Sequence, residues 1–368
     1  MKRVLLIAGS ALDGCPYMTT YMEVLRRNDI PFDFLFWNRI LYDTNHLPDN
    51  YIPYNSLTLN SYPKWKKVYK IGEFASFARK QMKQKEYSFV VVCTIAHAVF
   101  LYPYLKSHYR GQYVFDIRDY SPLCKTPLLS FAIEKLVAYS AFTVLSSRGF
   151  LRWLPHGKSC HYIISHNTTF EALSKQKKAL CPVAVPKVIG LLSIGLLRDF
   201  ESNSVVISQL VNHPRYKLQF SGVGIVEELR NVASSQNASN IVFTGWYSKS
   251  DEAQIVARCD MLNNYCNPDI GGNSLMSNRF YHSVLFRKPM IVRKGSFQAE
   301  QVSNYGLGVL LDDNDDFDEK IMQWWNEYDA ERYDSGCRKF ISDVCSDLER
   351  FEGALRNLYA STSNIVHK

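Results

Sequence analysis

The sequence has no long apolar run. No stretch approaches the roughly 18–20 consecutive apolar residues of a transmembrane helix, and the longest candidates, such as residues 89–93, have the length of a strand. Lys2, Arg3 and the apolar residues 4–8 could be misread as a signal peptide, but that run is shorter than the ~7–15 residues of a signal core. We therefore expect a chain that does not span a membrane, with residues 4–9 as a buried first strand.

Zinc and disulfide patterns are also missing. The nine cysteines include no C-x-x-C pair and have no histidine partners at zinc spacing. Reduced thiols in a cytoplasmic protein are the simplest interpretation. Disorder is excluded as well, because 46% of the residues are apolar and 14% are aromatic.

What the sequence does contain is a series of short apolar runs, separated by stretches long enough for a helix. This alternation is typical of β-α-β units, and the runs are too uniformly apolar for strands with one wet face. It predicts an α/β protein in which each half is a Rossmann-like, doubly wound parallel sheet. The predicted strands are residues 4–9, 32–37, 89–94, 113–117, 142–145 and 162–165 in the first half, and 188–194, 217–221, 241–244, 261–265, 289–292 and 309–311 in the second.

The length predicts two domains, since 368 residues exceed the usual size of a single core. Residues 174–187 are basic first and then carry two prolines, which favours a linker. We predict an N-terminal domain at 1–173, a C-terminal domain at 188–345, and a C-terminal helix at 346–368 that docks back on the N-terminal domain. Two such sheets facing each other would place the carboxyl ends of their strands along one cleft, where ligands bind.

One candidate loop of the first half follows the first predicted strand. It contains Gly9, Asp13 and Gly14, and its backbone amides could approach an anion or an acceptor. It is not a G-x-G-x-x-G motif, and a plain strand-to-helix turn remains an equal alternative.

A second candidate loop follows the strand at 113–117 and contains Arg118 and Asp119. Both would face the cleft if this strand is central. A structural salt bridge or a helix cap is the competing interpretation for either residue.

The second half offers two cationic positions after predicted strands. Gly195 and Arg198 follow the strand at 188–194, where a guanidinium could form paired hydrogen bonds with a diphosphate. Further on, the Gly-Gly-Asn-Ser turn at 271–274 is expected to open a helix that contains Arg279. Free amides at that helix start, together with the arginine, would form a site for a phosphate dianion.

Three segments of the second half carry a family resemblance. Residues 277–291, SNRFYHSVLFRKPMI, resemble the P-N-K-L-Y-E-Y-L-A-x-G-K-P-V-I segment of family 4-like GT-B glycosyltransferases. Residues 243–248, FTGWYS, are similar to that family's F-x-G-x-V/Y turn, and residues 299–308, AEQVSNYGLG, to its loop before the last strand. The motifs lie within residues 188–310, with a fainter echo at 116–122.

The resemblance implies a GT-B architecture of two facing Rossmann-like domains with a cleft between them. The C-terminal domain would bind a nucleotide-sugar, with a UDP-sugar favoured, the N-terminal domain would bind the acceptor, and no metal or other cofactor would be required. Arg279 matches the lysine that neutralises the donor diphosphate, Arg198 the basic residue after the domain's first strand, and Tyr247 the loop that contacts the base. The expected donor-binding residues are Gly195, Tyr247, Gly272, Asn273, Ser274, Asn278 and His282.

Two positions depart from the family pattern. His282 replaces the glutamate that usually holds the ribose hydroxyls, so a bidentate carboxylate is lost. Glu201 stands about where the family often has a lysine, which adds a negative charge. A non-catalytic protein that binds a sugar or a partner therefore stays open, as does a sugar-nucleotide epimerase or hydrolase-like enzyme.

As implied by the resemblance, the activity is transfer of a sugar to a glycan or a polyprenyl-diphosphate-linked acceptor in surface polysaccharide synthesis. Retention of configuration is expected, and Asp119 is the candidate for orienting the acceptor or acting as a base. The acidic run at 312–316 could be taken for a metal-binding D-x-D motif, but a solvated loop is favoured.

A basic segment accounts for part of the +8 net charge. Between Lys64 and Lys85, apolar side chains at helical spacing alternate with many lysines and one arginine. Such segments dock on anionic lipid, which would place the protein on the inner face of the cell membrane. A normally packed, solvated helix fits equally well, and nucleic acid binding is not expected because no binding module accompanies the basic residues.

Overall fold

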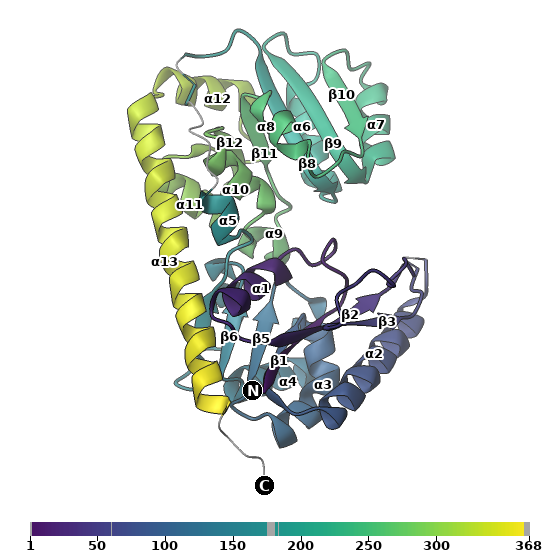
Figure 1. Cartoon of the computed structure of the whole chain (residues 1–368). Helices are drawn as coiled ribbons and strands as arrows, with labels where there is room; N and C mark the ends of the chain where they lie inside the picture. Colours follow the sequence, from purple (N-terminus) through teal and green to yellow (C-terminus); the bar gives the residue numbers. More distant parts are fainter. Residues whose placement is uncertain (1, 60, 175–180, 183, 364–368) are drawn as a thin grey trace. The chain divides into compact units, whose positions relative to one another are not determined.

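The computed structural model describes residues 2–59, 61–174, 181–182 and 184–363, so much of the predicted linker lies outside the described residues. The described chain forms two compact units. Unit 1 comprises Met1–Phe170 together with Ser346–Lys368, and unit 2 comprises Glu171–Cys345. Each unit contains one sheet (Figure 1).

Unit 1 is built on a seven-stranded sheet of order β3-β2-β1-β4-β5-β6-β7, in which every described strand pair is parallel. The order reverses between β1 and β4, as in doubly wound folds. The strands are β1 (Arg3–Ala8), β2 (Phe32–Asn38), β3 (Tyr51–Asn55), β4 (Tyr87–Cys93), β5 (Tyr113–Ile117), β6 (Phe142–Leu145) and β7 (Tyr162–Ile164). The helices are α1 (Met18–Arg27), α2 (Lys64–Gln84), α3 (Ile95–His108) and α4 (Pro127–Tyr139), with short 3-10 turns at Pro122–Lys125 and Arg148–Arg152. Helix α5 (Phe170–Ser174) begins at the boundary and continues into unit 2.

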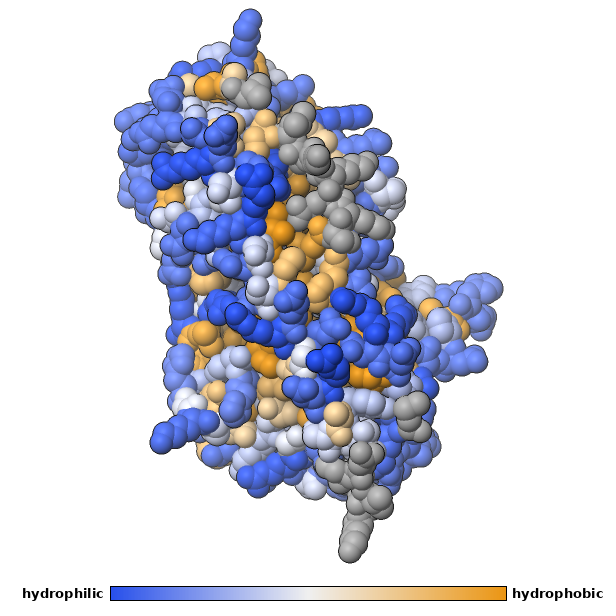
Figure 2. Space-filling view, turned by 60° about the vertical axis from the view of Figure 1, so that its left-hand side comes forward, coloured by the Kyte–Doolittle hydropathy of each residue, from blue (hydrophilic) through white to orange (hydrophobic). Residues whose placement is uncertain are grey.

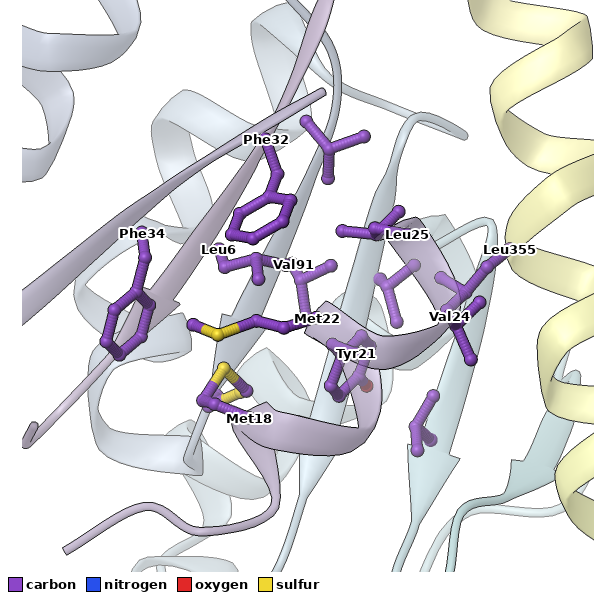
Figure 3. Close-up of a cluster of buried hydrophobic side chains, with 14 of the residues drawn as sticks. Leu6, Met18, Tyr21, Met22, Val24, Leu25, Phe32, Phe34, Val91 and Leu355 are labelled. Atoms are coloured by element: carbon purple, nitrogen blue, oxygen red, sulfur yellow. The ribbon is translucent and has the colours of Figure 1, made fainter. Parts of the chain in front are cut away.

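The core of unit 1 is continuous across one face of this sheet. Helix α1 places Tyr21, Val24 and Leu25 against the strands, where all three are fully buried (Figure 3). The second half of α13 (Ala330–Thr362) adds Phe351 and Leu355 to the same cluster. A buried aliphatic or aromatic side chain of this kind stabilises the fold by about 1.5–3 kcal/mol, so the C-terminal segment is an integral part of unit 1.

Unit 2 is built on a six-stranded sheet of order β10-β9-β8-β11-β12-β13, again parallel in every described pair. The strands are β8 (Ile189–Leu197), β9 (Tyr216–Gly224), β10 (Ile241–Gly245), β11 (Met261–Asn264), β12 (Met290–Arg293) and β13 (Gly308–Leu311). The helices are α6 (Phe200–Leu210), α7 (Val226–Ser235), α8 (Glu252–Ala257), α9 (Ile270–Ser274), α10 (Asn278–Leu285), α11 (Phe297–Tyr305) and α12 (Phe317–Asn326), and the first half of α13 completes the unit.

The predicted fold class of two Rossmann-like parallel-sheet domains is confirmed, and all twelve predicted strands are present. One strand, β3, is missing from the prediction. It contains Pro53, which argues against a central strand, but β3 lies at the edge of the sheet and pairs only with β2. A proline is tolerated there because one side of the strand needs no partner.

No described helix is long and apolar enough to cross a bilayer. The face of the molecule in Figure 2 is largely hydrophilic, with separate apolar areas between the polar side chains.

Candidate functional site

The carboxyl ends of β8 and β9 form the floor of the candidate site in unit 2. Gly195 and Gly222 are paired in the register of these strands and have φ values of 99° and 140°. A Cβ on Gly222 would lie 1.8 Å from the carbonyl oxygen of Gly195, so only glycine fits. Strands β8 and β9 therefore stay paired at Gly195 and Gly222, where a side chain on Gly222 would push them apart.

Arg279 lies in the first turn of α10, beside the end of β11. Ser277 caps this helix by accepting a hydrogen bond from the Phe280 amide at 3.2 Å. The Arg279 guanidinium donates to the carbonyl oxygen of Asn263 at 2.8 Å, and its other terminal nitrogen lies 4.0 Å from the Asp199 carboxylate. Only 14% of the side chain is exposed, so the orientation of the guanidinium is well defined.

Arg198 brings a second cation to the same place. It follows β8 directly and is exposed. Burial lowers the pKa of Arg279, the nearby Arg198 lowers it further, and Asp199 opposes both effects. Asp199, the next residue after Arg198, lies 4.0 Å from the Arg279 guanidinium, so both cations stand at the same sheet edge. Two cations at one sheet edge favour the binding of an anion.

Beside the cations lies a cluster that joins α8 and α10. Glu252 accepts hydrogen bonds from Lys249 at 2.6 and 2.8 Å and from Tyr247 at 3.4 Å, and its Oε1 lies 2.7 Å from Nε2 of His282. Burial alone would raise the pKa of Glu252, but the hydrogen bond and charge of His282 and then those of Lys249 lower it to about 2. Burial and Glu252 together raise the pKa of Tyr247 to about 12. The carboxylate is therefore ionised and Tyr247 is neutral at ordinary pH.

Glu252 and Asp199 were not among the predicted site residues. Each follows a strand end by a few residues and sits at or just before the start of a helix, where an acidic residue usually serves the helix dipole. Only the structure shows that these carboxylates contact His282 and Arg279. His282, which departs from the family pattern, thus has a carboxylate next to it, supplied by a different helix.

The prediction that residues 271–274 open the helix with Arg279 is wrong. Gly272 and Ser274 lie inside a separate short helix, α9, which Asp269 caps by accepting from the Gly272 amide at 2.6 Å. The chain leaves helical geometry at Leu275, and α10 begins only at Asn278. The physical reason is that two capping side chains, Asp269 and Ser277, each start a helix of their own.

The remaining predicted donor residues lie on or near these two helices. Gly272 is buried, and a Cβ there would lie 2.1 Å from the carbonyl oxygen of Asn267. The Ser274 hydroxyl donates back to the carbonyl of Ile270. Asn273 is half-buried and Asn278 is exposed. Glu201 is also exposed, in the first turn of α6.

In unit 1, the loop after β1 packs against a buried histidine. A Cβ on Gly9 would lie 2.3 Å from Cε1 of His97, so this glycine permits the close approach. The Gly14 amide donates to Ala11 at 3.0 Å in a tight turn, and α1 begins at Met18. Asp13 and Gly14 are exposed.

Arg118 and Asp119 have contrasting surroundings. Arg118 is buried and donates to both oxygens of Asp116, at 2.6 and 2.7 Å, and to the carbonyl of Ser165 at 2.9 Å. Asp116 is itself fully buried and also accepts from the hydroxyl of Tyr21 at 2.5 Å. These contacts match the structural salt bridge that was the alternative for Arg118. Asp119 is exposed.

Side chains of the acidic run at 312–316 form hydrogen bonds and ion pairs with neighbouring residues. Asp313 accepts from Arg293 and Tyr265 at 2.7 Å each, Asp315 pairs with Lys294, and Asp316 caps α12. Within the described residues, no group of three or more His, Cys, Asp or Glu side chains is placed to hold a metal ion.

Known proteins match this chain in structure and not in sequence. No family model and no curated protein matches. Sucrose-phosphate synthase from Thermosynechococcus elongatus aligns over 98% of this chain and 100% of its own, with a TM-score of 0.73 at 12% identity. HepE from Anabaena, solved in complex with UDP-glucose, covers 97% and 100% with a TM-score of 0.62 at 14% identity. The lipopolysaccharide outer core galactosyltransferase WaaB covers 96% and 99% with a TM-score of 0.64 at 12% identity.

The chain has the GT-B fold. At these identities the likeness concerns the architecture alone. Which reaction this GT-B protein performs depends on its own residues.

Proposed function

We propose that this chain is a glycosyltransferase that moves a sugar from a nucleotide-diphosphate sugar to a glycan or a polyprenyl-diphosphate-linked acceptor. The observation that carries the proposal is the pair Arg198 and Arg279 at the carboxyl edge of the unit 2 sheet, one exposed and one held by Asn263. Carboxyl edges of such sheets are where nucleotides bind. A UDP-sugar is the favoured donor, since HepE, which shares the fold, is solved with UDP-glucose.

The two arginines would act on the leaving group. As the bond between the anomeric carbon and the donor phosphate oxygen breaks, negative charge grows on the nucleoside diphosphate, and fixed guanidinium groups stabilise it. Retention would follow if the acceptor oxygen attacks the same face and passes its proton to the departing phosphate. In that route no metal and no separate general base are needed, and Asp119 orients the acceptor.

The other assignments follow from this arrangement. Gly195, Tyr247 and His282 surround the nucleoside end of the donor, while Gly272, Asn273, Ser274 and Asn278 lie along its phosphates and sugar. On the acceptor side we assign Gly9, Asp13 and Gly14, in an N-terminal domain at 1–173. Arg118 is left out of this assignment because its guanidinium is buried against Asp116. The remaining boundaries of the proposal are a linker at 174–187, a donor domain at 188–345 and a C-terminal segment at 346–368. This segment contains the second half of α13, which begins at Ala330 and not at 346.

We place the enzyme in the cytoplasm, at the inner face of the cell membrane, in surface polysaccharide synthesis. A polyprenyl-linked acceptor would be presented there. Titration calorimetry with UDP-, GDP-, TDP- and ADP-sugars tests the donor class directly. Tight binding of one nucleotide is expected, and no binding of any would refute the donor site.

Arg279→Ala tests the site itself. Losing hydrogen bonds from a charged group, worth about 1.5–3 kcal/mol, should weaken nucleotide binding by roughly 10- to 100-fold. Arg258→Ala, at an exposed position after α8, is the matched control and should bind as the wild type does. Equal affinities of the two variants would contradict the assignment.

A non-catalytic binding protein is the second candidate. Asp199 lies 4.0 Å from the Arg279 guanidinium and partly offsets its charge, which weakens stabilisation of a leaving diphosphate. An assay of nucleotide release with and without acceptors separates the cases. Binding without turnover would favour the binding protein, and turnover of the nucleotide-sugar without any acceptor would favour an epimerase or hydrolase.

A further inference from the structure

Helix α2 of unit 1 exposes three large apolar side chains in its first two turns. Trp65, Val68 and Tyr69 are 70%, 52% and 61% exposed. Their spacing of three and four residues places them on one side of the helix. The side chains by which α2 packs on the unit come further along the helix: Phe74, Ala75, Ala78 and Met82. Phe74, Ala78 and Met82 lie on another side of the helix than Trp65 and Tyr69.

Two loops extend this apolar surface. The amide of Thr58 donates to the carbonyl of Arg39 at 3.0 Å, which joins the loop after β2 to the loop that leads into α2. Both loops carry further exposed apolar side chains. We call the whole set the apolar corner: Ile40, Leu41, Leu57, Leu59, Trp65, Val68 and Tyr69.

Cations continue the same side of α2 towards its C-terminus. Lys83 follows Trp65 by eighteen residues, which is five full helical turns, and Arg79 and Lys80 flank that line. All three are exposed. They border an open groove of about 500 Å³ against α3, which Ser76, Pro103, Tyr104 and Ser107 complete.

The charge of the protein is concentrated in this region. Residues 39–85 contain nine Lys and Arg against three Asp and Glu, whereas the whole chain has a net charge of only +8. An apolar and aromatic end beside a row of cations is the composition that binds the interface of an anionic bilayer, where Trp and Tyr rings enter the headgroup level and cations meet lipid phosphates.

We propose that the apolar corner, together with Arg79, Lys80 and Lys83, docks unit 1 on an anionic lipid bilayer. The docking surface is thus narrower than the basic segment from Lys64 to Lys85, since the buried side of α2 takes no part in it. Membrane docking is consistent with the proposed lipid-linked acceptor but does not depend on glycosyl transfer.

Other occupants fit this surface less well. A second copy docked symmetrically through the same face would bring the cations of both copies into one interface, which opposes association. Nucleic acid would use the cations but would leave the apolar corner in water. An anionic bilayer pairs with both parts at once.

Co-sedimentation of the full chain with vesicles tests the proposal, with no nucleotide or acceptor present. We expect binding to vesicles of phosphatidylcholine mixed with phosphatidylglycerol, weak binding to phosphatidylcholine alone, and loss of binding as salt rises. The variant Arg79→Gln, Lys80→Gln, Lys83→Gln should lower partitioning by on the order of 100-fold, since each cation near such a surface contributes about fivefold. A matched control removes the same three charges elsewhere: Arg258→Gln, Arg332→Gln and Arg356→Gln.

Trp65→Ser combined with Tyr69→Ser tests the apolar corner, with circular dichroism to verify the fold. This variant should partition at least tenfold more weakly, as ring burial is lost. Equal binding to neutral vesicles, equal losses in the control variant, or concentration-dependent dimers in place of lipid binding would overturn the proposal. Vesicle binding by a chain that binds no nucleotide-sugar would refute the proposed function alone.

Discussion

The carboxyl edges of the two sheets use their charges in opposite ways. In unit 1, Asp116 and Arg118 are buried and satisfy each other, with Tyr21 and Ser165 completing the network. In unit 2, Arg198 is exposed and Arg279 is held in place by Asn263. The same topology therefore supports a sealed ionic pair in one unit and an anion site in the other.

The backbones at the two edges differ as well. In unit 2 the positive φ angles at the ends of β8, β9 and β10 fall on glycines, which leave the backbone open to close approach: Gly195, Gly222, Gly224 and Gly245. At the carboxyl end of β4 in unit 1, Thr94 takes a φ of 73° although it carries a side chain. Its hydroxyl lies 2.6 Å from Nδ1 of His97. In unit 1 the backbone at Thr94 is strained, and its side chain contacts the buried His97. In unit 2 glycines take the positive φ angles without such strain and leave space beside the backbone.

Replacing one arginine in each unit tests the difference between the two edges most directly. Arg118→Leu leaves the fully buried Asp116 without its cationic partner and should lower the free energy of unfolding by about 3–5 kcal/mol. Arg198→Leu, at an exposed position, should change it by no more than about 0.5 kcal/mol. Urea denaturation of both variants gives the two values.

In nucleotide affinity the larger loss should occur in Arg198→Leu, the variant with the smaller loss of stability. Arg198→Leu is expected to weaken UDP binding about tenfold, whereas the folded fraction of Arg118→Leu should bind UDP as the wild type does. A large stability loss in Arg198→Leu would mean that both edges are structural.

The architecture was predictable because buried parallel strands leave a strong pattern of short apolar runs. The exception, β3, contains Pro53 and is only partly buried, so it lacks the uniformly apolar composition of the other strands. The predicted start of the helix that contains Arg279 was wrong for a different reason. Residues 269–285 contain two capping side chains eight positions apart, Asp269 and Ser277, and each begins a helix. A prediction based on the glycines alone merges these two helices into one.

The candidate site was predictable only in part. Arg198, Arg279 and Tyr247 stand directly in segments that resemble a known family, so their positions follow from the chain itself. Glu252 and His97 do not, because their roles arise from contacts across 30 and 88 residues, with His282 and Gly9. Such long-range polar contacts have no local pattern.

His97 provides the second test, of how tightly the edge of unit 1 is sealed. Burial, together with the charge of Arg39, lowers the pKa of His97 to about 4. Because the unfolded chain takes up a proton at a pKa near 6.5, stability is fully present above that pH and falls as the pH drops towards 4. The loss should reach about 3 kcal/mol.

Chemical denaturation between pH 4 and 7 measures this slope. His97→Gln should flatten it, although buried His166, whose pKa is also lowered by burial, retains a part. His46→Gln, at an exposed loop position, should leave the slope unchanged. An unchanged slope in His97→Gln would show that water reaches this edge.

The last test, with the smallest expected effect, concerns Glu252 in unit 2. This tightly paired carboxylate contacts two candidate donor residues, Tyr247 and His282. Glu252→Gln removes the charge that holds His282 and should cost about 2 kcal/mol of unfolding free energy at pH 7. The cost should vanish as the pH falls from 4.5 through about 2, where the native carboxylate itself takes up a proton. Lys249→Ala, which removes a largely exposed partner of the same carboxylate, should cost less than about 1 kcal/mol. Equal costs for the two variants would mean that the surface ion pair, and not the contact with His282, holds Glu252 in place.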